Sequence, residues 1–143
     1  MVATGSDTVD AIIHTAHRIR TTADAALRTH GLSLPGLKLL TALAEGDRSM
    51  REISEILHVA PRTVTDITDG MQARGLVTRH PHPVDRRVTL LRLTEAGTRE
   101  LTTASAEGER VALASISGLD PGEQRTLRDL LERVCVPVIR SPG

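Results

Sequence analysis

The chain has 143 residues, the length of one domain and enough to bury a continuous core. It contains no phenylalanine, tyrosine or tryptophan, so the core must be aliphatic, and stacking of bases on aromatic rings, the usual means of holding single-stranded nucleic acid, is not available. Eighteen basic and eighteen acidic residues give zero net charge, which argues neither for nor against a polyanionic partner. Residues 61–93 nevertheless carry six arginines against three aspartates, a local charge of +3.

The cysteine content and the hydropathy indicate a cellular compartment. Cys135 is the only cysteine and has no partner for an internal disulfide, and no charged-then-apolar leader opens the chain. No apolar run approaches the roughly 20 residues that a membrane-spanning helix needs. We therefore expect a cytoplasmic protein without a membrane partner.

Residues 7–29 are predicted to form one long amphipathic helix that ends near Gly31, because apolar residues recur there at helical spacing. Such a helix has more apolar surface than one neighbouring helix covers, so a second copy of the chain is expected to cover the rest. His14 and His17 lie three residues apart on this helix and could ligate one metal ion. The favoured interpretation is two surface histidines, with no metal and no cofactor.

Residues 49–75 are predicted to form two short helices joined by a three-residue turn, after an earlier helix that Ser33 caps. Ser49 and Glu52 have the spacing of a capping box, which begins the first helix. Pro61 suits the first position of the second helix, and Gly75 suits a left-handed C-cap. The turn at 58–60 is too short for a long antiparallel pair and is typical of a helix-turn-helix.

The two helices are expected to meet along one apolar seam, leaving the opposite face of the second helix free. The seam is predicted to contain Ile53, Ile56, Leu57, Val64, Ile67 and Met71. The outward side chains are small, polar or cationic, which suits a DNA groove; they are Arg62, Thr63, Thr65, Asp66 and Asp69.

Residues 76–80 and 87–93 are predicted to be two strands of a hairpin, since both are short and rich in Val, Leu and Thr. Two prolines stiffen the loop at 81–86, and Asp85 is placed to pair with a neighbouring arginine. A stiff, arginine-tipped hairpin after a helix-turn-helix is a wing, and arginine suits a narrow minor groove. The alternative is a solvated hairpin with a surface ion pair.

Two further helices complete the chain. Thr94 is expected to cap a helix that reaches about Ser117, and Asp120, Pro121 and Glu123 open a last helix. Pro137 should kink or end that helix. Its apolar face also lacks an obvious cover within one chain and contains Leu127, Leu130, Leu131, Val134, Cys135, Val138 and Ile139.

The predicted fold is mainly α with a small β-hairpin wing, and the chain resembles the MarR family of bacterial winged helix-turn-helix regulators. Five segments carry the resemblance: 50–57, 61–66, 73–77, 85–87 and 93–97. The resemblance implies one MarR-like domain over 1–143. In that domain 7–30 and 95–143 form dimerisation helices, and 33–94 form the winged DNA-binding part.

The resemblance also implies roles for individual residues in binding double-stranded DNA. The helix from Pro61 would enter the major groove with Arg62, Thr63 and Thr65 as contacts. Arg87 would reach the minor groove while Asp85 orients it, and Arg86 at the tip would either contact phosphate or share the role of Arg87. Ser49, and Ser33 with it, would hold phosphate at a helix start.

Two positions depart from the family pattern. His58 stands in the turn where relatives often have glycine, although histidine tolerates a left-handed conformation better than most residues. Asp66 stands where many relatives have arginine. A carboxylate repels phosphate, so Asp66 would either accept from a cytosine amino group or pair with Arg62.

The function implied is a homodimeric regulator of a pseudo-palindromic operator, a repressor of a neighbouring promoter released by a small lipophilic or phenolic anion. The candidate anion-binding groups are His14, His17, Arg18 and Arg28, with His30 near them. Three alternatives stay open: a redox-responsive regulator that senses through Cys135, a metal-binding protein using His14 and His17, and a winged helix that contacts protein instead of DNA.

Overall fold

The computed structural model describes residues 5–134. Within them no helix combines the length and the apolar character that crossing a membrane requires. The helices are α1 (Gly5–Arg28), α2 (Leu34–Ala44), α3 (Met50–Leu57), α4 (Pro61–Ala73), α5 (Glu95–Ser115) and α6 (Pro121–Glu132), and the strands are β1 (Arg48–Ser49), β2 (Val77–Pro81) and β3 (Thr89–Leu93).

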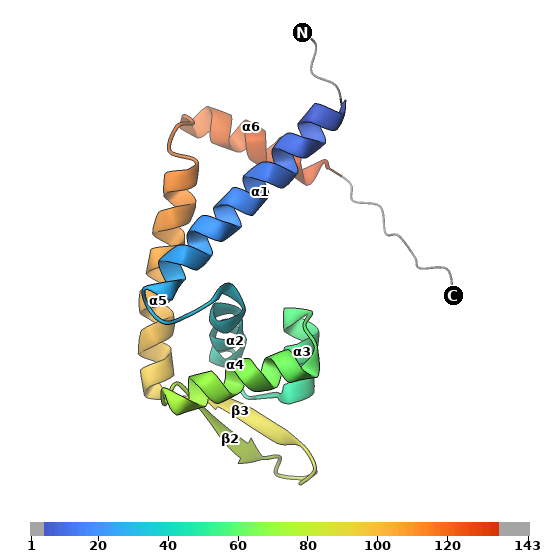
Figure 1. Cartoon of the computed structure of the whole chain (residues 1–143), viewed down its shortest axis with the longest axis vertical. Coiled ribbons are helices and arrows are strands. Elements are labelled where there is room, and N and C mark those ends of the chain that lie inside the picture. Colours follow the sequence, from blue (N-terminus) through green and yellow to red (C-terminus); the bar gives the residue numbers. More distant parts are fainter. Residues whose placement is uncertain (1–4, 135–143) are drawn as a thin grey trace, which may run out of the picture.

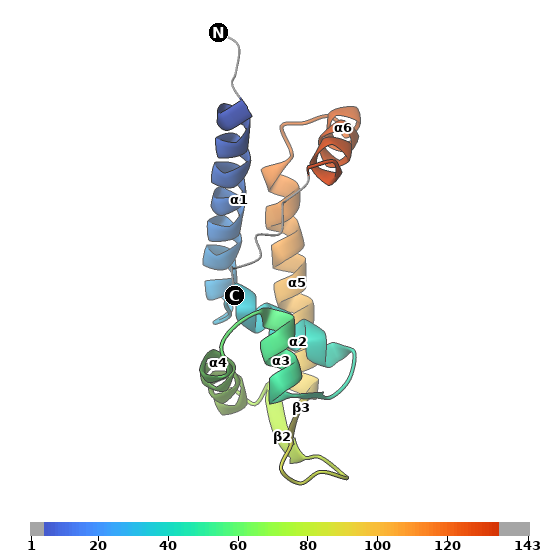
Figure 2. The same cartoon turned by 90° about the vertical axis from the view of Figure 1, so that its right-hand side faces the viewer.

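The elements separate into two ends. The long helices α1 and α5 contact one another and extend away from the cluster formed by α2, α3, α4 and the sheet (Figures 1 and 2). The β2–β3 hairpin projects from that cluster, and α6 lies at the opposite end of the molecule (Figure 1). The predicted class, mainly α with a small hairpin wing, is confirmed.

The helix starts follow the predicted caps. The Ser33 and Thr94 hydroxyls accept hydrogen bonds from the amides of Gly36 and Gly97, and begin α2 and α5. Capping boxes begin α3, through Ser49 and Glu52, and α6, through Asp120 and Glu123. Each cap satisfies amides that have no partner inside the helix, so these boundaries are local properties of the sequence.

The turn between α3 and α4 is also as predicted. His58 adopts the left-handed conformation with φ 53°, so this histidine does take the position at which glycine is usual. The Ser54 hydroxyl donates to the Val59 carbonyl oxygen at 2.7 Å and closes the turn. Pro61 occupies the first turn of α4, and Gly75 follows that helix with φ 72°.

The sheet has one strand more than the sequence predicts. Its order is β1-β3-β2, and both pairs are antiparallel. β1 has only two residues, too few for an alternating pattern, and it exists because Arg48 and Ser49 pair with Leu91 and Leu90 of β3. The two wing strands form where predicted, with Val77 opposite Leu93 and Pro81 opposite Thr89. β2 lies one residue later than predicted and β3 begins two residues later, at Thr89, so the loop spans 82–88 and includes Arg87.

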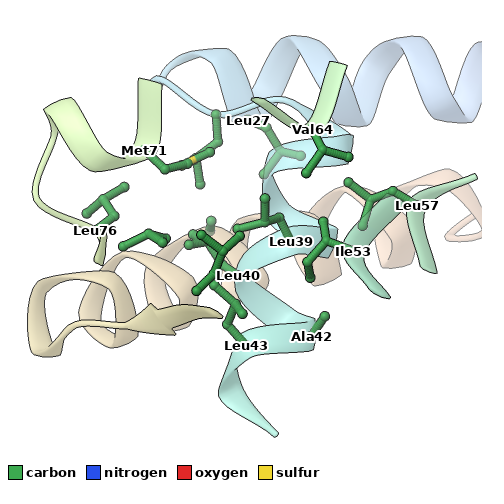
Figure 3. Packing of buried hydrophobic residues seen from close by; sticks show 14 residues of the cluster. Leu27, Leu39, Leu40, Ala42, Leu43, Ile53, Leu57, Val64, Met71 and Leu76 are labelled. Atoms are coloured by element: carbon green, nitrogen blue, oxygen red, sulfur yellow. The ribbon is translucent and has the colours of Figure 1, made fainter. Parts of the chain in front are cut away.

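The core is aliphatic and is built around α2, which contacts α1, α3, α4, α5 and β3. Leu39 and Leu40 are fully buried, and Leu43 nearly so (Figure 3). Leu27 from α1, Ile53 from α3, and Val64 and Met71 from α4 complete the same cluster. The helices α3 and α4, the sheet, and the long helices α1 and α5 therefore share one core.

The predicted seam is wrong at one position and incomplete at another. Ile56 is 45% exposed, because α3 is short and buries only the row of Ile53 and Leu57. Thr68 is fully buried in α4, in the row of Val64 and Met71. Its hydroxyl bonds to the Met50 sulfur at 4.0 Å, so a threonine with a hydrogen-bonded hydroxyl occupies a seam position that the predicted apolar set does not include.

Among residues 5–134, part of the apolar surface of α1, α5 and α6 is left uncovered. Large hydrophobic side chains are exposed on α1 (Val9, Ile13 and Ile19), on α5 (Leu113) and on α6 (Leu127, Leu130 and Leu131), and Val134 just after α6 is exposed as well. Helix α5, which the sequence predicts to reach about Ser117, ends at Ser115. Cys135, Pro137, Val138 and Ile139 lie outside the described residues.

We expect Leu39→Ala to lower the free energy of unfolding by about 2–5 kcal/mol, because truncating a fully buried leucine leaves a cavity among aliphatic neighbours. Chemical denaturation at one fixed protein concentration measures the change. Val84→Ala, at a side chain that is exposed, is the control and should change stability by no more than about 0.5 kcal/mol. Equal effects of the two substitutions would contradict a core centred on α2.

Candidate nucleic-acid interface

The outward face of α4 begins with four exposed polar residues. Arg62, Thr63, Thr65 and Asp66 all lie on the solvent side, while Val64 between them is fully buried. The Thr65 hydroxyl donates to the Pro61 carbonyl oxygen at 3.1 Å. The start of α4 thus presents a narrow face of small side chains flanked by one arginine.

The middle of α4 is tied to the wing by a residue that sequence reasoning missed. Arg79 of β2 donates to the Asp69 carboxylate at 2.6 Å and also to the Gln72 side-chain oxygen. Asp69, predicted as part of the free outward face, is therefore an internal partner. No sequence pattern relates a helix residue to a strand residue ten positions later, so the Asp69–Arg79 pair is found only in the folded structure.

The end of α4 is fixed to the long helices by Arg74. Its guanidinium donates to the carbonyl oxygens of Gly31, at 2.8 Å, and His30, at 2.9 Å, in the connection that follows α1. It also lies 3.6 Å from the Glu100 carboxylate of α5. One side chain therefore joins α4 to both long helices.

The wing holds Arg87 through the predicted partner Asp85. The Arg87 Nε and Nη2 donate to the two carboxylate oxygens at 3.1 and 3.3 Å, and the Arg87 amide donates to Oδ1 at 3.1 Å. These bonds hold the pKa of the Asp85 carboxyl below its ordinary value of 3.8. The Arg87 side chain is nevertheless 90% exposed, so Asp85 holds its orientation while the guanidinium stays accessible to solvent.

The tip of the wing is closed by His82. Its Nδ1 accepts hydrogen bonds from the amides of Val84 and Asp85 at 3.1 and 3.0 Å. The His82 amide donates to the Val88 carbonyl oxygen, and the Val88 amide donates to the Asp85 carbonyl oxygen. The loop is therefore a hydrogen-bonded unit, stiffer than its two prolines alone would make it.

The arginines of residues 61–93 divide into two groups. Arg74, Arg79, Arg87 and Arg92 each form an ion pair, the last with Asp47 at 2.7 Å. Within residues 5–134 neither Arg62 nor Arg86 makes an ion pair, and both are exposed. Asp66 likewise has no arginine partner in this part of the chain, so the predicted pairing with Arg62 is not found.

Ser49 lies close to the wing. Its hydroxyl accepts from the Glu52 amide at 3.1 Å, and its own amide donates to the Glu52 carboxylate. Ser49, Arg51 and Arg87 line one hollow of about 320 Å³ between α3 and the wing. Arg51, 89% exposed and paired with Glu55, is a second cation there that sequence reasoning missed.

The predicted anion-binding residues gather only in part. His17 and Arg28 line a hollow of about 630 Å³ between α1, α2 and the end of α3, whereas His14 and Arg18 lie outside it. Three further cationic or titratable side chains line it, namely Arg20, Lys38 and His58. Asp24 is the one carboxylate in its lining, and it pairs with Arg28 at 3.0 Å.

His14 and His17 are both exposed on α1. No set of three or more His, Cys, Asp or Glu side chains within residues 5–134 is grouped as a metal site requires. Cys135, on which the redox alternative depends, lies outside these residues.

Comparison with known proteins gives a consistent result. A sequence model of the MarR family matches residues 30–88. The repressor IacR of Pseudomonas putida is 32% identical over 109 residues, 76% of this chain and 65% of IacR. The regulator YsmB of Bacillus subtilis is 33% identical over 130 residues, 89% of this chain and 77% of YsmB. The chain belongs to the MarR family.

MarR-family proteins are DNA-binding transcription regulators and not enzymes. The fold agrees with that of MarR from E. coli, with a TM-score of 0.79 at 20% identity, covering 93% of this chain and 97% of the other. The matched part of the chain spans just under two thirds of IacR and of the regulator YdgJ from Bacillus subtilis, 65% and 64%.

The Asp85–Arg87 pair of this MarR-family wing can be tested by titration. We expect Arg87→Ala to raise the pKa of the Asp85 carboxyl toward 3.8, because it removes the guanidinium that stabilises the charged form. Since the pKa is lowered in the folded protein, the pair is complete above pH 3.8 and is lost as the pH falls through the lowered value.

NMR titration of the Asp85 side-chain carbon measures this pKa. Arg86→Ala is the matched control, because Arg86 neighbours the pair without bonding to it, and it should leave the titration near that of the native protein. An Asp85 titration that is identical in the native protein and in Arg87→Ala would contradict the geometry.

Proposed function

We propose that the chain is a homodimeric transcription regulator that reads duplex DNA with α4 in the major groove and the wing in the minor groove. The observation that carries the proposal is a pair of exposed arginines that form no ion pair with any residue from 5 to 134. Arg62 stands at the start of α4, and Arg86 stands in the wing loop beside Arg87. These positive charges at one end of the molecule are suited to phosphates and groove edges.

The face of α4 supplies the base contacts in this proposal. Arg62 donates to guanine or phosphate, and Thr63 and Thr65 offer hydroxyl and methyl groups to base edges. Asp66 accepts from a cytosine amino group, the base contact that carboxylates commonly make in the major groove. This face lacks the aromatic or methionine anchors typical of a protein interface core, which disfavours the alternative of a wing that contacts protein.

The wing and α3 supply the second contact. Asp85 orients Arg87 toward the minor groove, and Arg86 meets phosphate. Ser49, at the N-terminus of α3, contributes a phosphate contact next to Arg87. Because several of these contacts are to phosphate, affinity should fall steeply as salt rises.

The dimer is proposed from the terminal helices. The leucines of α6, Leu127, Leu130 and Leu131, are exposed in the described part of the chain, and so are Val9 and Ile13 of α1. A patch of this kind marks an interaction surface. Two-fold symmetry would then place two half-sites about 10–10.5 base pairs apart, or a multiple of that spacing.

The regulator is proposed to act as a repressor of a neighbouring promoter, in keeping with the relatives IacR and NicR, which are both repressors. A small lipophilic or phenolic anion would release it from DNA. The hollow between α1, α2 and α3 supports this step, because its lining is rich in cations and lies where the long helices meet the DNA-binding elements.

We expect Arg87→Ala to weaken binding to the native operator by about 1–3 kcal/mol, since it removes the minor-groove contact. A gel-shift series at fixed salt measures the change. Arg110→Ala is the control, an exposed arginine of α5 that also pairs with a carboxylate, and should bind as the native protein does. Unchanged affinity of Arg87→Ala would remove the wing from the mechanism.

The effector step is tested with benzoate as a simple aromatic anion. We expect millimolar benzoate to displace DNA from the native protein but not from Arg20→Ala, which lacks a cation of the hollow. Arg18→Ala is the matched control, an exposed arginine of the same helix outside the hollow. Equal displacement from both variants would rule out this hollow as the effector site for anions of this class.

A further inference from the structure

His82 has an unusual role in the wing loop. One nitrogen of its ring, Nδ1, accepts hydrogen bonds from two consecutive backbone amides, those of Val84 and Asp85, at 3.1 and 3.0 Å. Exposed loop amides normally bond to water, so a side chain that gathers two of them fixes the local backbone. The ring is only partly exposed.

This geometry requires one protonation state and one tautomer. An imidazole nitrogen accepts a hydrogen bond only when it carries no proton, so Nδ1 is bare and the single proton of the neutral ring is on Nε2. Nδ1 is attached to Cγ, as is the Oδ1 of aspartate or asparagine. His82 therefore closes the same type of turn that those residues close with a side-chain oxygen.

The turn determines where Arg87 is held. The Asp85 amide is anchored by His82, while the Asp85 carboxylate accepts from the amide and guanidinium of Arg87. The contacts thus run in series from the His82 ring through Asp85 to Arg87. If the Asp85 backbone is released, its carboxylate no longer has a fixed position from which to orient the arginine.

We propose that the neutral imidazole of His82 is a positioning group for DNA binding, because it folds the wing tip on which Asp85 holds Arg87. The inference rests on the proposed role of the wing. His82 itself touches no base in this account, so its loss weakens binding to all duplexes by a similar factor and leaves the preferred sequence unchanged.

The test compares His82→Ala with His82→Asn. Fluorescence anisotropy at pH 8, with a duplex that the native protein selects from a random library, measures affinity. We expect His82→Ala to bind about fivefold to tenfold more weakly, as loss of one or two net hydrogen bonds implies. His82→Asn should restore most of the affinity, because its Oδ1 replaces Nδ1. Thermal unfolding should be nearly the same for all three proteins.

A spectroscopic measurement gives the second readout. In the native protein and in His82→Asn the Val84 and Asp85 amide protons should exchange slowly with solvent in NMR hydrogen-exchange spectra, because a side-chain acceptor bonds both of them. In His82→Ala both amide protons should exchange fast, because that acceptor is gone. A role of His82 in stability alone would not produce this pattern.

The outcomes separate the two proposals. Equal affinity of the native protein and His82→Ala would overturn the role of His82, and so would an asparagine variant as weak as the alanine variant. If Arg87→Ala weakens binding while His82→Ala does not, only the role of His82 fails. A native protein that enriches no duplex would overturn the proposed function together with this inference.

Discussion

The helices α3 and α4, the sheet and the long helices α1 and α5 are positioned by the aliphatic packing of α2. Leu39 and Leu40 are fully buried and contact a cluster that takes residues from every neighbouring element (Figure 3). Because the chain has no aromatic residues, its core consists of aliphatic side chains that pack against one another. Protein interiors are close-packed, so a core of this kind tolerates little change in side-chain volume. A shift of α2 would therefore move α4, the sheet and the long helices together.

Electrostatic contacts refine what the core positions. Arg79 joins α4 to the wing, and Arg74 joins α4 to α5 and to the connection after α1, so the two elements of the proposed DNA-binding surface are fixed to one another and to the long helices. Exposed pairs of this kind contribute little to stability. Their effect is on geometry, because they hold one side of α4, while Arg62 and Arg86 have no ion-pair partner among residues 5–134.

Local rules were sufficient for most of the fold. Capping residues, Pro61 and Gly75 define helix ends within a few residues of sequence, and these predictions are confirmed. β1 was missed because two residues carry no period, and Thr68 was missed because its burial depends on neighbours from other elements. Hydrophobicity alone misassigned Ile56, which α3 turns toward solvent.

The contacts of the candidate site also divide into those that the sequence predicts and those that it does not. Asp85 and Arg87 are two residues apart, so their pairing could be predicted from the sequence and is confirmed. The partner of Asp69 lies ten residues away on a strand, and the role of His82 depends on a rotamer that no spacing encodes. The hollow beside α1 includes His17 and Arg28 but also Lys38 and His58 from other elements, which only the packed chain brings near.

The most direct test of the account is hydroxyl-radical footprinting of the native protein on a duplex that it selects from a random library, with sedimentation of the complex. The account predicts two symmetric protected segments about 10–10.5 base pairs apart, or a multiple of that spacing, and two chains on each duplex. A single unsymmetric protected segment with one chain per duplex would contradict it, as would failure to select any duplex.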